Sequence, residues 1–164
     1  MSSQKFRAAL CFPAMLAAAV MLVGGAATAG ECPADKVMAD AQKPGPSKPK
    51  GVTDTVRASI DLAKEAPALD GRDLRLRELV IKPGGIVPWH SHAERPAIIY
   101  IVSGTVVEYA STCAVPLVHK AGDVVAETHP VTHWWRNEGK TTVKLLSADI
   151  FDARAADKAK AHVM

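Results

Sequence analysis

Histidines at two places in the sequence could bind one metal ion together. His90 and His92 are separated by one residue and lie between runs of β-branched residues. In a β-strand, residues two apart point to the same face and lie about 7 Å apart along the chain. Two imidazoles placed in this way can bind one ion, while Trp89 and Ser91 face the other side of the strand. Two surface histidines on a polar strand face would give the same string, so a third histidine in a suitable context is needed.

That third histidine is His133, in the segment 122–137, which reads GDVVAETHPVTHWWRN. Together with the segment 84–104, GGIVPWHSHAERPAIIYIVSG, it resembles the two sequence motifs of the cupin superfamily, small β-barrels that usually hold a metal. The first motif is Gly, five residues, His-x-His, three or four residues, Glu, six residues and Gly. The second ends in His, three residues and Asn. The positions that match these motifs in order and spacing are Gly84, His90, His92, Gly104, Gly122, His133 and Asn137.

The resemblance implies that His90, His92 and His133 are the metal ligands. Ala97 occupies the position of the metal-binding Glu in the first motif, and Thr128 and Pro130 replace the Pro and Gly of the second motif. Three imidazoles suit a divalent transition metal such as Fe, Mn, Co, Ni, Cu or Zn, and the ligand type alone does not choose among them. Three protein ligands leave coordination positions open, as in catalytic sites. The alternative is that the histidines only line a cavity and hydrogen-bond one another.

Several charged residues near the motifs have two interpretations. Glu94 could reach back as a fourth ligand, but we favour a solvated loop carboxylate. Glu127 and His129 could supply a general base or orient a ligand, but we expect them to be polar loop residues. Arg95 could bind an anionic substrate, but a surface ion pair is the simpler expectation.

The remaining aromatic and histidine side chains receive simpler predictions. Alternation from His133 points Trp135 inward and Trp134 outward, so Trp134 and Trp89 could belong to the interface of a homodimer. His119 and His162 match no motif and are expected to be exposed.

The first 29 residues have the pattern of a secretory signal peptide. Basic residues are followed by an apolar run and by Ala-Thr-Ala, which predicts cleavage after Ala29 and a periplasmic or secreted protein. A transmembrane anchor is the alternative, but the apolar run is close to the lower length limit for spanning. After cleavage no membrane association is expected.

Removing residues 1–29 takes away two basic side chains, so 20 becomes 18 against 17 acidic side chains, a net charge of +1. This balance gives no argument for nucleic-acid binding, and no basic run interleaved with aromatic residues is present. Two cysteines remain, Cys32 and Cys113. An even number of cysteines in an exported chain predicts a disulfide, with two free buried thiols as the alternative.

The mature chain divides into an arm, a barrel and a tail. Residues 30–52 are rich in proline and lysine and predict an irregular arm, whose only evident attachment is the expected bond from Cys32 to a surface Cys113. Residues 53–152 hold short alternating runs separated by turns, typical of an all-β barrel or sandwich. The family resemblance specifies a double-stranded β-helix of the jelly-roll type. Residues 153–164 form a tail.

The alternation also predicts how individual strands are paired. We expect a strand over 72–82 to stop at residues 83–85, and the run 96–109 to form a hairpin around Ser103 and Gly104. We expect the segments 132–135 and 141–151 to form the next pair.

Two classes of function fit the sequence. The first is an exported metalloenzyme, an oxygenase or an isomerase acting on a small organic molecule, with the metal as Lewis acid and template. The second is a non-catalytic protein that binds a small ligand in the same barrel, with or without metal, and Ala97 favours this class. No substrate-specific motif is present.

Overall fold

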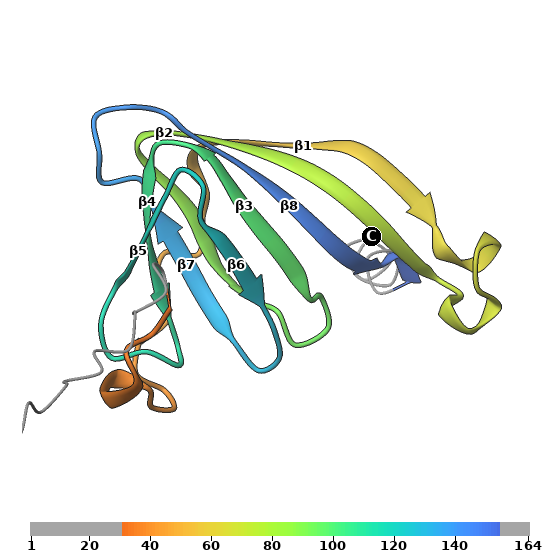
Figure 1. Cartoon of the computed structure of the whole chain (residues 1–164), viewed down its shortest axis with the longest axis horizontal. Coiled ribbons are helices and arrows are strands. Elements are labelled where there is room, and N and C mark those ends of the chain that lie inside the picture. Colours follow the sequence, from red (N-terminus) through yellow and green to blue (C-terminus); the bar gives the residue numbers. More distant parts are fainter. Residues whose placement is uncertain (1–30, 155–164) are drawn as a thin grey trace, which may run out of the picture.

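The structure is a computed structural model that describes residues 31–154. The expected signal peptide and most of the tail lie outside these residues. The described part is almost entirely β-structure, as the alternation predicts (Figure 1). The strands are β1 (Lys50–Asp61), β2 (Arg72–Ser91), β3 (Ala97–Ser103), β4 (Thr105–Ala110), β5 (Leu117–Lys120), β6 (Val124–Glu127), β7 (Thr132–Arg136) and β8 (Val143–Asp152). The helices are three short 3-10 turns, η1 (Ala34–Lys36), η2 (Leu62–Lys64) and η3 (Pro67–Leu69). None of the helices within residues 31–154 has the length and hydrophobicity needed to cross a bilayer.

The strands form one curled antiparallel sheet. Their order is β5-β4-β7-β2-β8-β3-β6, and β1 pairs with β2 outside this path. Side chains alternate between the concave and convex faces, which is clearest in β3 and β8, where every second residue is buried. The concave face carries the main apolar core, formed by Leu79, Ile81, Ala97, Ile99, Ile101, Val106, Trp135, Val143 and Leu145. The expected all-β fold class is confirmed.

Strand β2 joins the two halves of the sheet, and its course corrects one prediction. The sequence predicted a stop at residues 83–85, but β2 runs through them without a break. Gly84 has a φ of +70°, a value that favours glycine, so the chain bends here instead of ending the strand. Residues before the bend pair with β1 and β8, and those after it pair with β7, although Ile86 also pairs with Lys50 at the start of β1.

Asn137, the last residue of the second motif, holds this bend in place. Its backbone N–H donates to the Gly85 carbonyl at 3.0 Å, and its carbonyl accepts the Gly84 N–H at 2.8 Å. The side-chain amide donates to the Ile81 carbonyl at 2.9 Å and to the Thr141 carbonyl at 2.8 Å. The side chain is fully buried. This Asn therefore has a structural role.

The two predicted strand pairs are wrong. Strands β3 and β4 follow one another at Ser103 and Gly104 but do not pair: β3 lies between β8 and β6, and β4 lies between β5 and β7. Strands β7 and β8 are separated by β2. Gly104 has a φ of +84°, and an added Cβ would lie 2.9 Å from Val143, so this glycine directs the chain from one half of the sheet to the other. Strand β6 was not predicted.

The N-terminal arm is attached to the barrel at several points. The structure contains the expected disulfide between Cys32 and Cys113, with Cα atoms 5.7 Å apart. Cys113 is fully buried instead of near the surface, because it packs with Ala110 and Leu117 in a small second core. The arm also makes backbone bonds, among them Met38 N–H to Thr112 O at 3.1 Å. The disulfide is therefore not its only attachment, and β1 begins at residue 50, earlier than the expected boundary at 53.

Candidate metal centre and cavity

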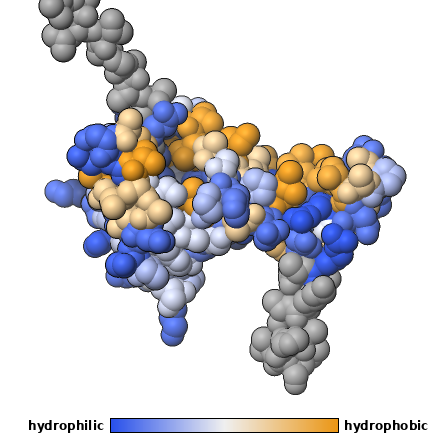
Figure 2. Space-filling view, turned by 90° about the horizontal axis from the view of Figure 1, so that it is seen from below, coloured by the Kyte–Doolittle hydropathy of each residue, from blue (hydrophilic) through white to orange (hydrophobic). Residues whose placement is uncertain are grey.

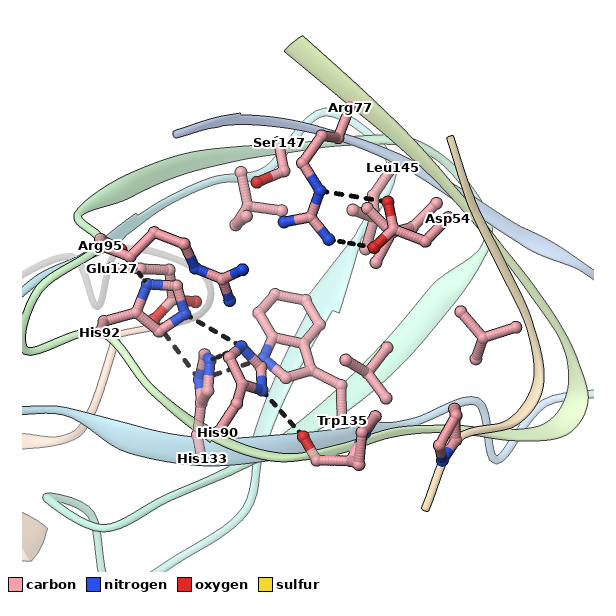
Figure 3. A pocket seen from close by; sticks show the side chains of 16 residues that line it. Asp54, Arg77, His90, His92, Arg95, Glu127, His133, Trp135, Leu145 and Ser147 are labelled. Carbon is pink, nitrogen blue, oxygen red and sulfur yellow. Dashed lines mark hydrogen bonds and ion pairs between the residues drawn. The ribbon is translucent and has the colours of Figure 1, made fainter. Parts of the chain in front are cut away.

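The three motif histidines come together on the concave face of the sheet (Figure 3). His90 on β2 and His133 on β7 are direct cross-strand partners. His92 follows the end of β2, and its backbone N–H donates to the Val131 carbonyl at 2.9 Å. The Nε2 atom of His90 lies 3.0 Å from that of His92 and 3.2 Å from that of His133. The structure thus brings together all three histidines that the motifs identify.

The hydrogen bonds at Nδ1 determine which ring nitrogen carries the proton. His90 Nδ1 lies 2.8 Å from the Pro88 carbonyl, and His92 Nδ1 lies 2.8 Å from the Arg95 carbonyl. Because a carbonyl can only accept, each of these Nδ1 atoms must donate an N–H. In the neutral imidazole, Nε2 then carries a lone pair. Both lone pairs are directed to the space between the rings.

Glu108 holds His133 in the same tautomer, and the sequence analysis did not identify it. This carboxylate lies on β4, with one oxygen 2.6 Å from His133 Nδ1 and the other 2.7 Å from His119 Nε2. Burial raises the pKa of Glu108, but the bonds to His119 and His133 outweigh burial and lower the pKa to about 2. Glu108 is therefore an anion that accepts both N–H groups. Trp135 Nε1 is also 3.1 Å from His133 Nδ1, but the shorter contact with the charged oxygen determines the proton position.

His119, which was expected to be exposed, is fully buried. Its ring stacks on Trp135 with centroids 4.9 Å apart and planes at 18°. It contacts none of the motif histidines' Nε2 atoms, so its role is to fix the Glu108 carboxylate. His162 lies outside the described residues.

His90 and His92 are kept neutral. Burial, then the neighbouring His133, lower the pKa of His90 from 6.5 to about 3 and that of His92 to about 4. At neutral pH the Nε2 lone pairs of these two rings therefore face each other and the Nε2 atom of His133. This arrangement is repulsive unless a cation lies between the rings, and neutral imidazole nitrogen is a good ligand for transition metals.

Glu127 is a second buried carboxyl group next to His133. It ends β6, with one oxygen 3.4 Å from His133 Nδ1, so the expectation of a polar loop residue was wrong. Burial, and then the negative charge of Glu108, raise the pKa of Glu127 to about 9, so it is protonated at neutral pH. Its Oε1 atom is buried without a hydrogen-bond partner in the described structure.

The register of the sheet places Glu127 directly across from Ala97. Ala97 occupies the motif position at which the family has its metal-binding Glu. A carboxyl group missing on β3 is therefore present on the neighbouring strand β6. Its oxygens are close to His133 and Glu108, and these three residues form a group separate from the cluster of His90, His92 and His133.

A cavity of about 340 Å³ opens above the histidine cluster. One part of its wall is apolar, and the other part is charged (Figure 3). The apolar wall includes Val52, Leu79, Val87, Ile99, Trp135 and Leu145. The charged wall includes Asp54, Arg77 and Arg95. Glu127 also lines the cavity, so its proton can reach a bound molecule.

Two aspartates, the buried Asp149 and the exposed Asp54, organise the charged wall. Arg75 binds both oxygens of Asp149, at 2.9 and 2.8 Å, and Arg77 adds a third bond at 3.1 Å. Arg77 also binds both oxygens of Asp54. Burial raises the pKa of Asp149, but the bonds and charges of the arginines outweigh burial and keep it below its ordinary value. Asp149 is therefore an anion, and the oxygens of both aspartates are already occupied by arginines.

The other predicted residues lie as follows. Glu94 and His129 are exposed, as a solvated loop carboxylate and a polar loop residue should be. Arg95 lines the cavity, is about one quarter exposed, and has an ion pair with Asp149 at 3.9 Å. Trp135 points inward, as predicted. Trp134 stacks on Tyr109 at 4.2 Å and lies against Gly45 of the arm, so the arm covers part of it.

Comparison with known proteins agrees with this architecture. The family model described as the cupin domain matches residues 77–149, which run from β2 to β8 and include all three histidines. The chain is a member of the cupin superfamily.

Curated relatives cover parts of the chain at modest identity. The auxin-binding protein ABP19b of Prunus persica is 28% identical over 82 residues, 48% of this chain and 39% of the relative. The germin-like protein subfamily 2 member 2 of Arabidopsis thaliana is 28% identical over 109 residues, 63% of this chain and 50% of the relative. The chain thus spans at most half the length of these relatives.

One solved structure with a TM-score above 0.5 supports the fold. The polyketide cyclase RemF of Streptomyces resistomycificus matches with a TM-score of 0.51 and 19% identity, covering 70% of this chain and 73% of that chain. A predicted oxalate decarboxylase of Thermotoga maritima matches with a TM-score of 0.49 and 24% identity, covering 61% and 80%. At this identity the likeness concerns the fold alone.

Proposed function

We propose that the protein binds one divalent transition metal ion through the Nε2 atoms of His90, His92 and His133. The observation that carries this proposal is the convergence of three Nε2 lone pairs, each oriented by an acceptor at Nδ1. Nitrogen ligands at about 2.0–2.1 Å from one ion lie roughly 3.0 Å apart when their angle at the metal is about 90°. The Nε2 separations of 3.0 and 3.2 Å fit neighbouring positions around one ion.

We further propose that the metal and the cavity act together on a small organic molecule. When bound, the ion would supply a Lewis acid beside the cavity. The apolar wall would exclude water and hold the body of the molecule. Glu127, protonated and without a partner at Oε1, would donate a proton to the bound molecule or hydrogen-bond it. This combination favours an isomerase or an oxygenase.

A non-catalytic ligand-binding protein is the second candidate, and Ala97 at the motif Glu position favours it. The two candidates differ in turnover. Metal-loaded protein is incubated with a panel of small organic acids and alcohols while oxygen uptake and product formation are measured. Oxygen uptake supports an oxygenase, a product without oxygen uptake supports an isomerase, and binding without turnover supports the second candidate.

Metal binding itself is tested by titrating metal-free protein with Zn²⁺, Mn²⁺, Co²⁺ and Ni²⁺ and following the melting temperature. An ion that binds only the folded state stabilises it by about 2.7 kcal/mol at 100 times its dissociation constant. His133→Ala should abolish this shift. His129→Ala is the matched control, because His129 is exposed in the same segment, and it should retain the shift. Equal shifts in both variants would refute the proposed site.

Export is also a proposal, and the Cys32–Cys113 disulfide supports it because such bonds persist in oxidising compartments. Cleavage after Ala29 predicts that the protein of the cell-envelope or secreted fraction begins at Gly30. An intact Met1 in the membrane fraction would contradict it.

A homodimer remains a prediction. Apolar residues lie at the surface of the extension built by β1 and the adjoining part of β2 (Figure 2). Ile60 and Leu74 are cross-strand partners there, and Leu76 lies on the same face. A second copy could cover this face. Light scattering after size-exclusion chromatography should give twice the monomer mass, and Leu74→Glu should restore the monomer. A monomeric wild-type protein would refute the prediction.

A further inference from the structure

Arg95 has a different environment from Arg77 of the charged wall and from Arg75, which shares Asp149 with Arg77. Arg75 and Arg77 direct their guanidinium groups at Asp149 and Asp54. Arg95 reaches Asp149 only through Nε at 3.9 Å, a distance beyond a hydrogen bond. The side chain is about one quarter exposed, and no hydrogen bond from its guanidinium group occurs within residues 31–154.

The direction of the Arg95 side chain is a second observation, beside the lack of hydrogen bonds from its guanidinium group. Its side chain points from the connection after β2 into the space between the histidine cluster and Arg77 (Figure 3). Its backbone carbonyl accepts the N–H of His92 at 2.8 Å. The residue that orients one histidine thus also directs a planar cationic group into the cavity.

The charges around the cavity leave an excess of positive charge for a ligand to neutralise. Asp54 and Asp149 already accept hydrogen bonds from Arg75 and Arg77, so neither carboxylate is available to Arg95. The charge of Glu108 is engaged by His119 and His133 behind the cluster. A divalent ion on the histidines would add to this excess.

The rest of the cavity limits what the anion can be. Apolar side chains form most of the remaining wall, and the volume of 340 Å³ equals that of roughly eleven liquid waters. A small inorganic anion would leave this apolar surface in contact with water, whereas an organic anion would cover it. A guanidinium group matches a carboxylate in shape and can bind both of its oxygens.

We propose that the cavity binds a small monocarboxylate with an apolar body, and that Arg95 binds its carboxylate beside the metal. This inference rests on the proposed metal site and specifies the substrate class of that site. The apolar part of the ligand lies against Trp135 and Leu145. Arg95 is a binding and specificity residue and is not a metal ligand.

The test uses benzoate as the probe and benzamide as its neutral analogue of the same shape. Binding of both to zinc-loaded protein is measured by calorimetry, for the wild type, for Arg95→Gln and for Arg57→Gln. Arg57 is the matched control, because its side chain is half-exposed on β1 and pairs with Glu78 away from the cavity. The wild type should bind benzoate at least tenfold more tightly than benzamide. Arg95→Gln should weaken benzoate binding at least tenfold and leave benzamide unchanged, and Arg57→Gln should stay within about twofold of the wild type.

Three results would overturn the inference: no benzoate binding by the wild type, equal benzoate binding by the wild type and Arg95→Gln, or benzamide binding as tight as that of benzoate. Sulfate is titrated in parallel, and sulfate binding as tight as benzoate binding would contradict the apolar part of the proposal. Zinc affinity is measured on the same samples. Arg95→Gln keeps the backbone carbonyl that orients His92, so its zinc affinity should not change. Zinc binding without Arg95-dependent benzoate binding refutes this inference alone, whereas absence of zinc binding refutes the metal site.

Discussion

Two buried glutamates contact the same histidine, and the structure predicts opposite outcomes when each is replaced by glutamine. Glu108→Gln should weaken metal binding about 10- to 100-fold, which is the usual cost of losing a carboxylate that orients a histidine ligand and equals roughly 1.4–2.7 kcal/mol. Glu127→Gln should leave the affinity within about threefold of the wild type.

The reason for the large effect of Glu108→Gln is the loss of an acceptor. The carboxylate accepts N–H groups from His133 at 2.6 Å and His119 at 2.7 Å. A glutamine has one carbonyl oxygen and one NH₂ group, so it can accept from only one of the two rings on its two sides. The other ring must leave a buried N–H unpaired or change its tautomer. If His133 changes its tautomer, its Nε2 carries the proton and no longer offers a lone pair to the metal.

The small effect of Glu127→Gln follows from the protonation of Glu127. Its pKa of about 9 makes it a neutral acid at pH 7, and a carboxamide has the same shape and charge as that acid. Only Glu108→Gln therefore removes a negative charge, although both glutamates are buried beside His133.

Competition with a zinc chelator at pH 7 measures both affinities. The melting temperature of each metal-free variant is the control for folding. If Glu127→Gln weakens binding as much as Glu108→Gln does, the assignment of charge to Glu108 and of the proton to Glu127 is wrong. If neither variant changes the affinity, His133 is not a ligand oriented by Glu108.

Three further predictions concern stability. Cys32→Ser opens a loop of 81 residues and should cost about 4 kcal/mol in urea unfolding, and a loss under 1 kcal/mol would show that the arm's other bonds suffice. In metal-free protein, His90 and His92 have pKa values of about 3 and 4, so below about pH 6.5 the unfolded chain binds more protons than the folded chain. The free energy of unfolding should therefore be highest above about pH 6.5 and should fall as the pH drops toward 4. A flat profile in this range would refute the neutral state of these two histidines. The raised pKa of Glu127 has the opposite effect on stability. Its contribution to the free energy of unfolding is lost as the pH rises from 4.5 to about 9, and Glu127→Gln should abolish this pH dependence. Asn137→Ala removes three side-chain hydrogen bonds, one of them to β2, and should cost about 2–3 kcal/mol without changing metal affinity per folded molecule. A change in affinity would assign Asn137 to the site.

The sequence predicted where the strands lie more reliably than which strands pair with one another. Alternating apolar residues indicate where a strand lies and which face is buried, and this is a local property. The Ser103–Gly104 turn resembles a hairpin locally, but Gly104 lies against Val143, and that contact between distant segments directs β4 away from β3. The same limit applies to the bend of β2, which Asn137 holds from another loop.

The metal ligands were predictable, but the residues that orient them were missed. The spacing of His90, His92 and His133 follows a sequence motif, whereas Glu108 and His119 belong to no motif. A signal for Glu108 was present, since it lies two residues after the buried Val106 and therefore faces the core. Glu127 could not be found in this way, because its position opposite Ala97 depends on the pairing of β3 with β6.

X-ray absorption spectroscopy of the metal-loaded protein tests the central claim most directly, because it reports the atoms bound to the ion. The account predicts one metal ion per chain, with three imidazole nitrogens at about 2.0–2.2 Å and oxygen from water or ligand in the remaining positions. His133→Ala should reduce the number of imidazoles or abolish binding, and His129→Ala should leave the spectrum unchanged. A shell with fewer than three imidazoles in the wild type, or a protein that binds no metal, would contradict the account.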